Sequence, residues 1–206
     1  MSGERVEFFY DLSSPWTYIA FHNLDAVIAR TGVSVRLRPI LVGGVFNAVN
    51  PSVYAAREAA DNPKFKHSWR VMRDWAKLAG VEINFPSIYH PAKSIHAMRM
   101  ACSLADDQVA LKTFSKAAFA SYFGAQENLD DPDVLVAVAN SVGLDGDALR
   151  ARAQSDDVKA LLRANTDEVI ARGGYGSPTI FVDKTYMYFG NDQLPLVEFA
   201  LNRSAA

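Results

Sequence analysis

The fold is decided by the stretch Val6-Glu-Phe-Phe-Tyr-Asp-Leu-Ser-Ser-Pro-Trp-Thr-Tyr18, in which two kinds of secondary structure meet. The β-branched and aromatic residues of 6–10 predict a short strand that is buried on both faces. Residues 11–14 have the composition of a turn, and Pro15 suits the first position of a helix that runs to about Arg30. The stretch therefore predicts a strand that leads directly into a helix.

The rest of the chain extends this start into a βαβ, helical block, ββα order. Thr31-Gly32 ends the first helix, and alternating apolar residues from Val33 predict a second strand before Pro39. Helical spacing and cap residues dominate from about 50 to 172. The remaining expected elements are helices near 69–79, 92–105, 107–123, 132–142, 144–153 and 155–172, a dense turn at 173–178, strands at 179–182 and 186–189 joined by a turn at 183–184, and a helix near 194–201.

This order of elements is that of a thioredoxin-like α/β fold with one mixed four-stranded sheet. Ser-Pro stands both at the first helix and before the third strand, as in that fold. We expect residues 1–49 and 173–206 to form a discontinuous thioredoxin-like domain. Residues 50–172 would form a large all-helical insertion.

The composition excludes several classes of protein. The 206 residues are 50% hydrophobic and 21% charged, which is typical of a globular chain, and the net charge of −2 gives no reason to expect nucleic acid or an anionic membrane as a partner. The start of the chain has no signal-peptide pattern, and no stretch approaches the roughly 20 apolar residues that span a bilayer. We therefore expect a soluble cytoplasmic protein that does not act at a membrane.

A single cysteine, Cys102, excludes an intramolecular disulfide, a zinc cluster of thiolates and a dithiol redox centre. A redox thioredoxin has two cysteines around the start of the first helix, where this chain has Ser14-Pro-Trp-Thr17. Hydroxyls cannot take part in thiol–disulfide exchange. Cys102 lies in an apolar helical pattern, so we expect a buried, inert thiol. The four histidines have no spacing that suggests a metal site.

Four motifs, in this order along nearly the whole chain, identify a family that the sequence resembles. They are Asp11-Leu-Ser-Ser-Pro-Trp-Thr-Tyr18, Arg38-Pro-Ile-Leu-Val-Gly-Gly-Val-Phe-Asn47, Gly173-Gly-Tyr-Gly-Ser-Pro178 and Phe189-Gly-Asn-Asp-Gln193. The sequence is similar to the family of 2-hydroxychromene-2-carboxylate isomerases and kappa-class glutathione transferases, a DsbA-like branch of the thioredoxin fold with a helical insertion. The resemblance implies that the protein binds glutathione at the N-terminus of its first helix.

Ser14 is the expected catalytic residue. From the sequence alone it is a helix N-cap, because a Ser before a Pro is a common helix start. The resemblance adds a second role, in which the positive end of the helix lowers the pKa of the glutathione thiol and the Ser14 hydroxyl donates a hydrogen bond to the thiolate. Ser13 is the weaker candidate, since Ser14 directly precedes the proline.

The resemblance also names residues that would bind the glutathione backbone. It implies a cis bond before Pro178, free backbone groups on Ser177, and close approach of the tripeptide at Gly176, whereas a proline at a strand start is ordinarily trans. Loop residue Asn47 would contact the backbone of glutathione. The resemblance implies that Asn191 and Asp192 bind the γ-glutamyl end of glutathione. It implies that Lys64 binds the glycine carboxylate, with Lys66 as the alternative.

The activity implied by the resemblance is a glutathione-dependent isomerisation of 2-hydroxychromene-2-carboxylate to trans-o-hydroxybenzylidenepyruvate in aromatic hydrocarbon catabolism. The thiolate would add to the substrate and later leave, and a dry pocket against the helical insertion would hold the aromatic ring. The alternatives are a kappa-class glutathione S-transferase acting on electrophiles and a non-catalytic binding protein of the same fold. The resemblance further implies a homodimer.

Three further features of the sequence are interpreted without reference to the glutathione site. Arg36 and Arg38 lie on one face of the second strand, where either could meet solvent or a substrate carboxylate. Trp69 and Trp75 are interpreted as core residues. Residues 173–176 are rich in glycine but lack the preceding strand and following helix of a dinucleotide-binding loop.

Overall fold

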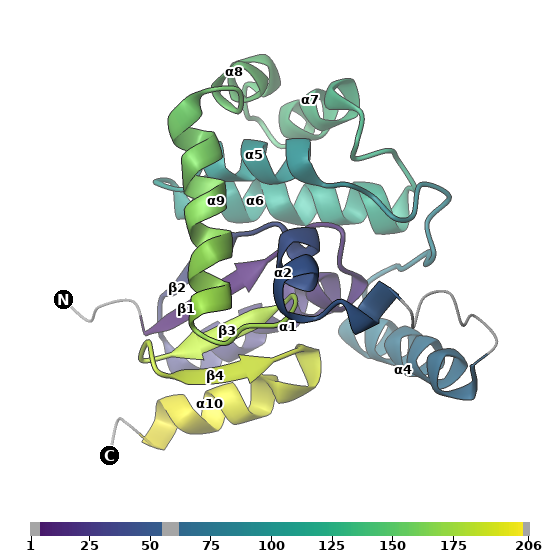
Figure 1. Cartoon of the computed structure of the whole chain (residues 1–206), viewed down its shortest axis with the longest axis vertical. Coiled ribbons are helices and arrows are strands. Elements are labelled where there is room, and N and C mark those ends of the chain that lie inside the picture. The colour runs from purple at the N-terminus through teal and green to yellow at the C-terminus, as the bar shows by residue number, and fades with distance from the viewer. Residues whose placement is uncertain (1–4, 55–61, 204–206) are drawn as a thin grey trace.

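The computed structural model describes residues 5–54 and 62–203, and its centre is a mixed four-stranded sheet (Figure 1). The strands are β1 (Val6–Tyr10), β2 (Val35–Pro39), β3 (Thr179–Val182) and β4 (Tyr186–Phe189), in the order β2-β1-β3-β4. β1 pairs parallel with β2 and antiparallel with β3, so that Phe8 lies opposite Leu37 and Ile180. This confirms the expected sheet and its strand positions.

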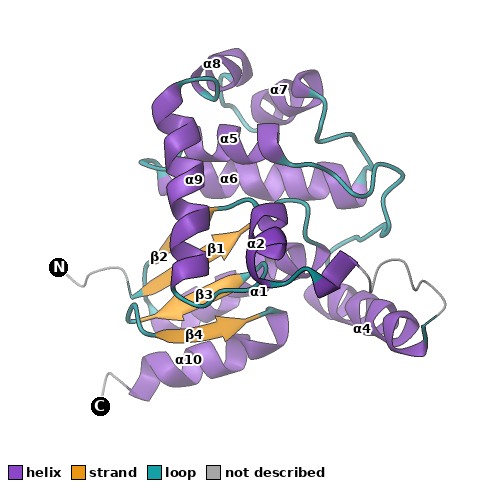
Figure 2. Cartoon of the chain, in the orientation of Figure 1, coloured by secondary structure: helices purple, strands orange, loops and turns teal. Residues whose placement is uncertain are grey.

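The helices cover both faces of the sheet (Figures 1 and 2). Their bounds are α1 (Pro15–Thr31), α2 (Val42–Val49), α4 (Pro63–Ala79), α5 (Ile95–Ser103), α6 (Gln108–Phe119), α7 (Pro132–Ser141), α8 (Gly146–Arg152), α9 (Asp156–Ala171) and α10 (Leu194–Arg203), with a π-helical turn η1 (Ala120–Gly124) and a 3₁₀ turn η2 (Asn191–Gln193). Phe8 and Tyr10 face a core that α1, α5, α6 and α10 complete. Phe9 faces α2 and α9 on the opposite side, so β1 is buried on both faces as predicted.

Local sequence signals mark the ends of the elements. Ser14 caps α1, and Gly32 ends it in the left-handed conformation with φ 66°. The same φ region at Asp183 and Lys184 closes the β3–β4 hairpin, where the Thr185 N–H donates to the Val182 carbonyl at 3.1 Å. These ends confirm the predicted helix start and hairpin turn.

Helix α2 was not expected, and it corrects the placement of Asn47. The sequence places Asn47 in a loop, whereas the structure places it in the last turn of this short helix. Gly43 and Gly44 weaken the local helical signal. The helix begins here because the buried Asp11 carboxylate accepts a hydrogen bond from the Val42 N–H at 2.8 Å. That partner lies 31 residues away, and no local pattern indicates it.

The division into a thioredoxin-like domain and a helical insertion stays a proposal. Parts of both proposed domains, residues 1–4, 55–61 and 204–206, lie outside the described residues. Helix α9 belongs to the 50–172 stretch but packs on the sheet, where Val169 joins Phe9 and Phe181 in one cluster. The larger core cluster likewise combines residues from all three stretches. The two parts therefore share their hydrophobic core. No helix within the described ranges is long and apolar enough to cross a membrane.

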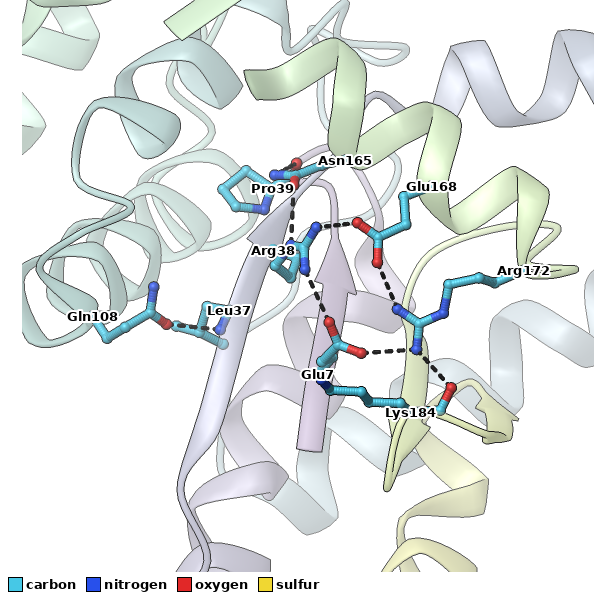
Figure 3. Close-up of polar contacts among 9 residues, drawn as sticks. All are labelled: Glu7, Leu37, Arg38, Pro39, Gln108, Asn165, Glu168, Arg172 and Lys184. Atoms are coloured by element: carbon cyan, nitrogen blue, oxygen red, sulfur yellow. Dashed lines mark hydrogen bonds and ion pairs between the residues drawn. The ribbon is translucent and has the colours of Figure 1, made fainter. Parts of the chain in front are cut away.

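Arg38 belongs to a polar network on the α9 face of the sheet (Figure 3). Its guanidinium pairs with Glu7 of β1 at 2.9 Å and with Glu168 of α9, and it donates to the Asn165 side chain at 3.0 Å. Arg172 closes the ring by pairing with Glu7 at 2.7 Å and Glu168 at 2.8 Å. Two internal carboxylates hold Arg38, which favours a structural role for it over the alternative that it binds a substrate carboxylate.

Candidate functional site

Ser14 lies at the N-terminus of α1 and makes contacts in two directions. Its Oγ accepts a hydrogen bond from the Thr17 N–H at 3.2 Å, which is the cap interaction that the sequence predicts. The same hydroxyl donates to the backbone carbonyl of Ser177 at 3.1 Å. Pro15 has no N–H, and the Trp16 N–H has no acceptor among the described residues. The start of α1 thus presents a positioned hydroxyl beside an unpaired backbone donor.

Ser177 faces Ser14 across the site, and the Ser177–Pro178 peptide bond is cis, as the resemblance implies. The Ser177 side chain is fixed from both sides, since its Oγ is 2.7 Å from the Thr17 Oγ1 and accepts from the Asp11 N–H at 2.9 Å. Its carbonyl is occupied by Ser14, whereas its N–H has no acceptor within the described part of the chain. The N–H of Ser177 is therefore the backbone group open to a ligand in this state.

A cavity of about 290 Å³ lies beside this pair, and we name it the Asp192 cavity. Gly176 makes room for the Phe189 ring of the cavity wall, because a Cβ there would come within 2.8 Å of that ring. Trp75 contributes both to this wall and to the cluster around Met72, so its interpretation as a core residue is incomplete. The lining residues are Trp16, Val71, Trp75, Ser177, Phe189, Gly190 and Asp192.

Asn191 and Asp192 lie side by side in sequence but in different environments. Asn191 is 2% exposed, and its Oδ1 accepts a hydrogen bond from the Asn23 side chain at 2.8 Å. Its Nδ2 is buried without an acceptor among the described residues. Asp192 is exposed and lines the cavity. Gln193 accepts from the Phe189 N–H at 2.8 Å, so its side chain serves the fold.

Neither Asn47 nor Lys64 lines the Asp192 cavity. Asn47 is exposed, and its Oδ1 accepts a hydrogen bond from the Tyr54 hydroxyl at 2.9 Å. Lys64 is exposed in the first turn of α4, and neither it nor Lys66 lines a cavity at the α1 N-terminus. Their roles toward a ligand stay predictions.

The sequence indicates only a turn at Asp11, whereas the structure places this residue in the framework of the site. Its carboxyl group is fully buried, at 0% exposure. One oxygen accepts from the N–H and hydroxyl of Ser13 at 2.8 and 2.9 Å, and the other from the Val42 N–H at 2.8 Å and the Ser94 hydroxyl at 3.1 Å. Burial raises the pKa of Asp11, against these hydrogen bonds, which lower it. The only signal in the sequence was an acidic residue directly after a buried strand.

The remaining chemistry-bearing residues lie away from this site. Cys102 is buried as predicted, and burial raises the pKa of its thiol to about 12, so the thiolate is not formed near neutral pH. Within the described ranges no three His, Cys, Asp or Glu side chains come together in a way that could hold a metal ion. The nucleophile for any sulfur chemistry must therefore come from a ligand.

The fold and the site together define the class of protein. The DSBA-like thioredoxin domain matches residues 5–202, and the chain belongs to that family. Among its relatives, a 2-hydroxychromene-2-carboxylate isomerase of Sphingobium xenophagum is 28% identical over 195 residues, covering 95% of this chain and 96% of that protein. A glutathione S-transferase kappa 1 of Rattus norvegicus is 24% identical over 213 residues, covering 95% and 90%.

The solved structure of a 2-hydroxychromene-2-carboxylate isomerase has the same fold. It superposes with a TM-score of 0.81 at 23% identity, covering 97% of this chain and 95% of that one. These similarities support an enzyme related to the isomerases and glutathione transferases.

Proposed function

We propose that this protein is a glutathione-dependent isomerase that interconverts 2-hydroxychromene-2-carboxylate and trans-o-hydroxybenzylidenepyruvate. The observation that carries the proposal is the contact of Ser14, at the positive end of α1, with Ser177, which lines the Asp192 cavity. The similarity to isomerases along nearly the whole chain supports the reaction class. A kappa-class transferase would use the same thiol site with a different acceptor.

The groups around the Asp192 cavity fit the chemistry of a γ-glutamyl tripeptide. The exposed Asp192 carboxylate suits the ammonium of the γ-glutamyl end, and the buried Nδ2 of Asn191 is a donor without an acceptor among the described residues. The unpaired Ser177 N–H suits the carbonyl of an extended peptide, as in strand addition. Asn47 would contact the glutathione backbone, and Lys64, or Lys66 in its place, the glycine carboxylate.

The chain's own residues would prepare and hold a thiolate. Glutathione, when bound, would supply a thiolate that adds to the double bond of the substrate and is later eliminated, so that the ring opens and rotation takes place about the intervening single bond without net oxidation. The Trp16 N–H and the dipole of α1 favour a negative charge at this helix end. The Ser14 hydroxyl turns its hydrogen from the Ser177 carbonyl to the anion while it still accepts from Thr17.

The wider expectations belong to the same proposal. We propose that the enzyme acts in aromatic hydrocarbon catabolism in the cytoplasm as a homodimer, and sedimentation equilibrium tests the dimer. The reaction is tested by following the ultraviolet absorbance of the chromene with and without glutathione. Equal rates in the two cuvettes would contradict the proposed role of glutathione. Calorimetry that detects no glutathione binding at millimolar concentration would favour a non-catalytic protein.

Replacing Ser14 by Ala tests the residue that carries the proposal. We expect turnover to fall by at least about 100-fold, because the thiolate loses its hydroxyl donor. The loss of the cap lowers the free energy of unfolding by only about 1 kcal/mol. The matched control is Ser155→Ala, which changes another serine at a helix N-terminus, that of α9. An S14A enzyme with the wild-type rate would remove Ser14 from the mechanism.

A further inference from the structure

A second cavity of about 290 Å³ borders the start of α1 on the side of α2 and α5, and we name it the Lys93 cavity. Three of its wall residues, Ser13, Val42 and Ser94, donate hydrogen bonds to the single buried carboxyl group of Asp11. These walls come from three separate segments, so Asp11 holds the cavity in shape. The lining residues are Ser13, Val42, Gly43, Phe46, Tyr54, His90, Pro91, Ala92, Lys93 and Ser94.

The walls of this cavity combine aromatic surface with one lysine. The rings of Phe46 and Tyr54 meet edge to face, with centroids 6.3 Å apart and an angle of 88°. Lys93 is the one Lys or Arg of the lining, which contains no Asp or Glu. The Asp192 cavity has the opposite character, with one carboxylate and no lysine or arginine in its lining.

The backbone that carries Lys93 is held in place. The Lys93 N–H donates to the Asp130 carboxylate at 2.9 and 3.1 Å, and the Ser94 N–H donates to the same group at 3.1 Å. Ser94 has a left-handed φ of 55°, a conformation that a non-glycine residue adopts only when its surroundings impose it. The Lys93 ammonium has no ion pair with any residue of the described ranges. The backbone at Lys93 is thus held in place, and no ion pair within the described ranges neutralises the side-chain charge.

We propose that the Lys93 cavity is the acceptor subsite and binds a flat monocarboxylate, with its ring against Phe46 and Tyr54 and its carboxylate paired with Lys93. The inference rests on the proposed function, because Ser13 in the wall directly precedes Ser14 at the thiol position. The opposite charges of the two cavities assign the ammonium end of glutathione to Asp192 and the acceptor carboxylate to Lys93. The proposal thereby names the residues that would form the expected pocket for the aromatic ring against the helical insertion.

Lys93→Met tests the assignment, since methionine keeps much of the apolar length and removes the charge. We expect the KM for 2-hydroxychromene-2-carboxylate to rise about tenfold or more, the loss typical of a charge-assisted hydrogen bond. The KM for the neutral electrophile 1-chloro-2,4-dinitrobenzene and the Kd of glutathione should stay unchanged. The matched control is Lys77→Met, which removes an exposed lysine of α4 outside both cavities.

Two results would overturn the assignment. A fall in glutathione affinity in K93M would show that Lys93 binds glutathione. Equal KM values for 2-hydroxychromene-2-carboxylate in the wild type and K93M, with unchanged glutathione affinity, would show that Lys93 binds neither ligand. Direct calorimetry with salicylate and neutral salicylamide separates this inference from the proposed function. Salicylate binding that depends on Lys93 supports the cavity even if glutathione does not bind, whereas equal binding of both probes contradicts it.

Discussion

At the scale of single residues, Asp11 is a carboxyl group surrounded by donors. The two closest contacts to its oxygens, at 2.8 Å each, are the backbone N–H groups of Ser13 and Val42, which can only donate. The group therefore links the end of β1 to the starts of α1 and α2, and through the Ser94 hydroxyl to the start of α5. An amide of the same size cannot replace it, because either orientation turns an NH₂ toward a backbone N–H.

We predict that Asp11→Asn lowers the free energy of unfolding by about 1–3 kcal/mol, the range for a buried hydrogen-bonding group that loses its partner. Urea unfolding followed by circular dichroism measures the change. The control is the exposed Asp106→Asn, which should lie within about 0.5 kcal/mol of wild type. An unchanged D11N protein would mean that the four contacts contribute nothing net to stability.

The same residue has a pH signature. Burial raises the pKa of Asp11 from its ordinary value of 3.8, so the folded state holds the proton more tightly than the unfolded state. The contribution of Asp11 to the free energy of unfolding therefore decreases as the pH rises from near 3.8 through the folded-state value. The difference between wild type and D11N, measured over that range, should show this fall.

At the scale of elements, the ring of Glu7, Arg38, Glu168 and Arg172 joins β1, β2 and α9 (Figure 3). Each carboxylate contacts both guanidinium groups, so the four charges balance. The Arg172 guanidinium also lies 3.7 Å from the centroid of the Phe181 ring. This network of four charged residues orients α9 on the sheet without involving the α1 N-terminus.

We expect Arg38→Met to lower the free energy of unfolding by about 2 kcal/mol, because it leaves Glu7 with little solvent and only one of its two cations. The Glu7 and Arg38 side chains are 12% and 20% exposed. Arg70→Met is the matched control, since its pair with Asp74 is 56–63% exposed and should contribute below about 1 kcal/mol. The KM for the chromene should stay at its wild-type value in R38M. A raised KM would restore Arg38 as a substrate ligand.

At the scale of the whole molecule, one hydrophobic core crosses the proposed domain boundary. Phe8 and Leu24 come from the first stretch, Met98 and Phe114 from the helical stretch, and Val182 from the last. Neither part buries its apolar face alone. The site depends on this sharing, because Ser94 of the helical part completes the walls around Ser13.

We therefore predict one cooperative unfolding transition. Fluorescence of Trp16, Trp69 and Trp75 and far-ultraviolet circular dichroism should give the same midpoint in urea, because both parts lose the shared core together. Two separated transitions would show instead that residues 50–172 fold independently of the sheet. A saturating concentration of glutathione should raise the single midpoint, since a ligand of the folded state stabilises it.

The sequence predicted the four strands and the start of α1 at Ser14, where a redox thioredoxin has a cysteine. These features follow from strand alternation, caps and turns, which are properties of neighbouring residues. It also predicted, through its family motifs, the cis bond at Pro178. It missed helix α2 and the ion pairs of Arg38, because the partners that decide them lie 31 and 130 residues away.

What the sequence determined by itself is therefore where the elements begin and which hydroxyl stands at the helix end in place of a thiol. Only the tertiary structure decided that Asp11 is buried among donors from three segments and that Ser14 touches Ser177, 163 residues along the chain. It also made one cavity acidic and the other basic. The physical reason is that burial, charge pairing and cavity shape depend on which distant segments meet, and no local pattern records that.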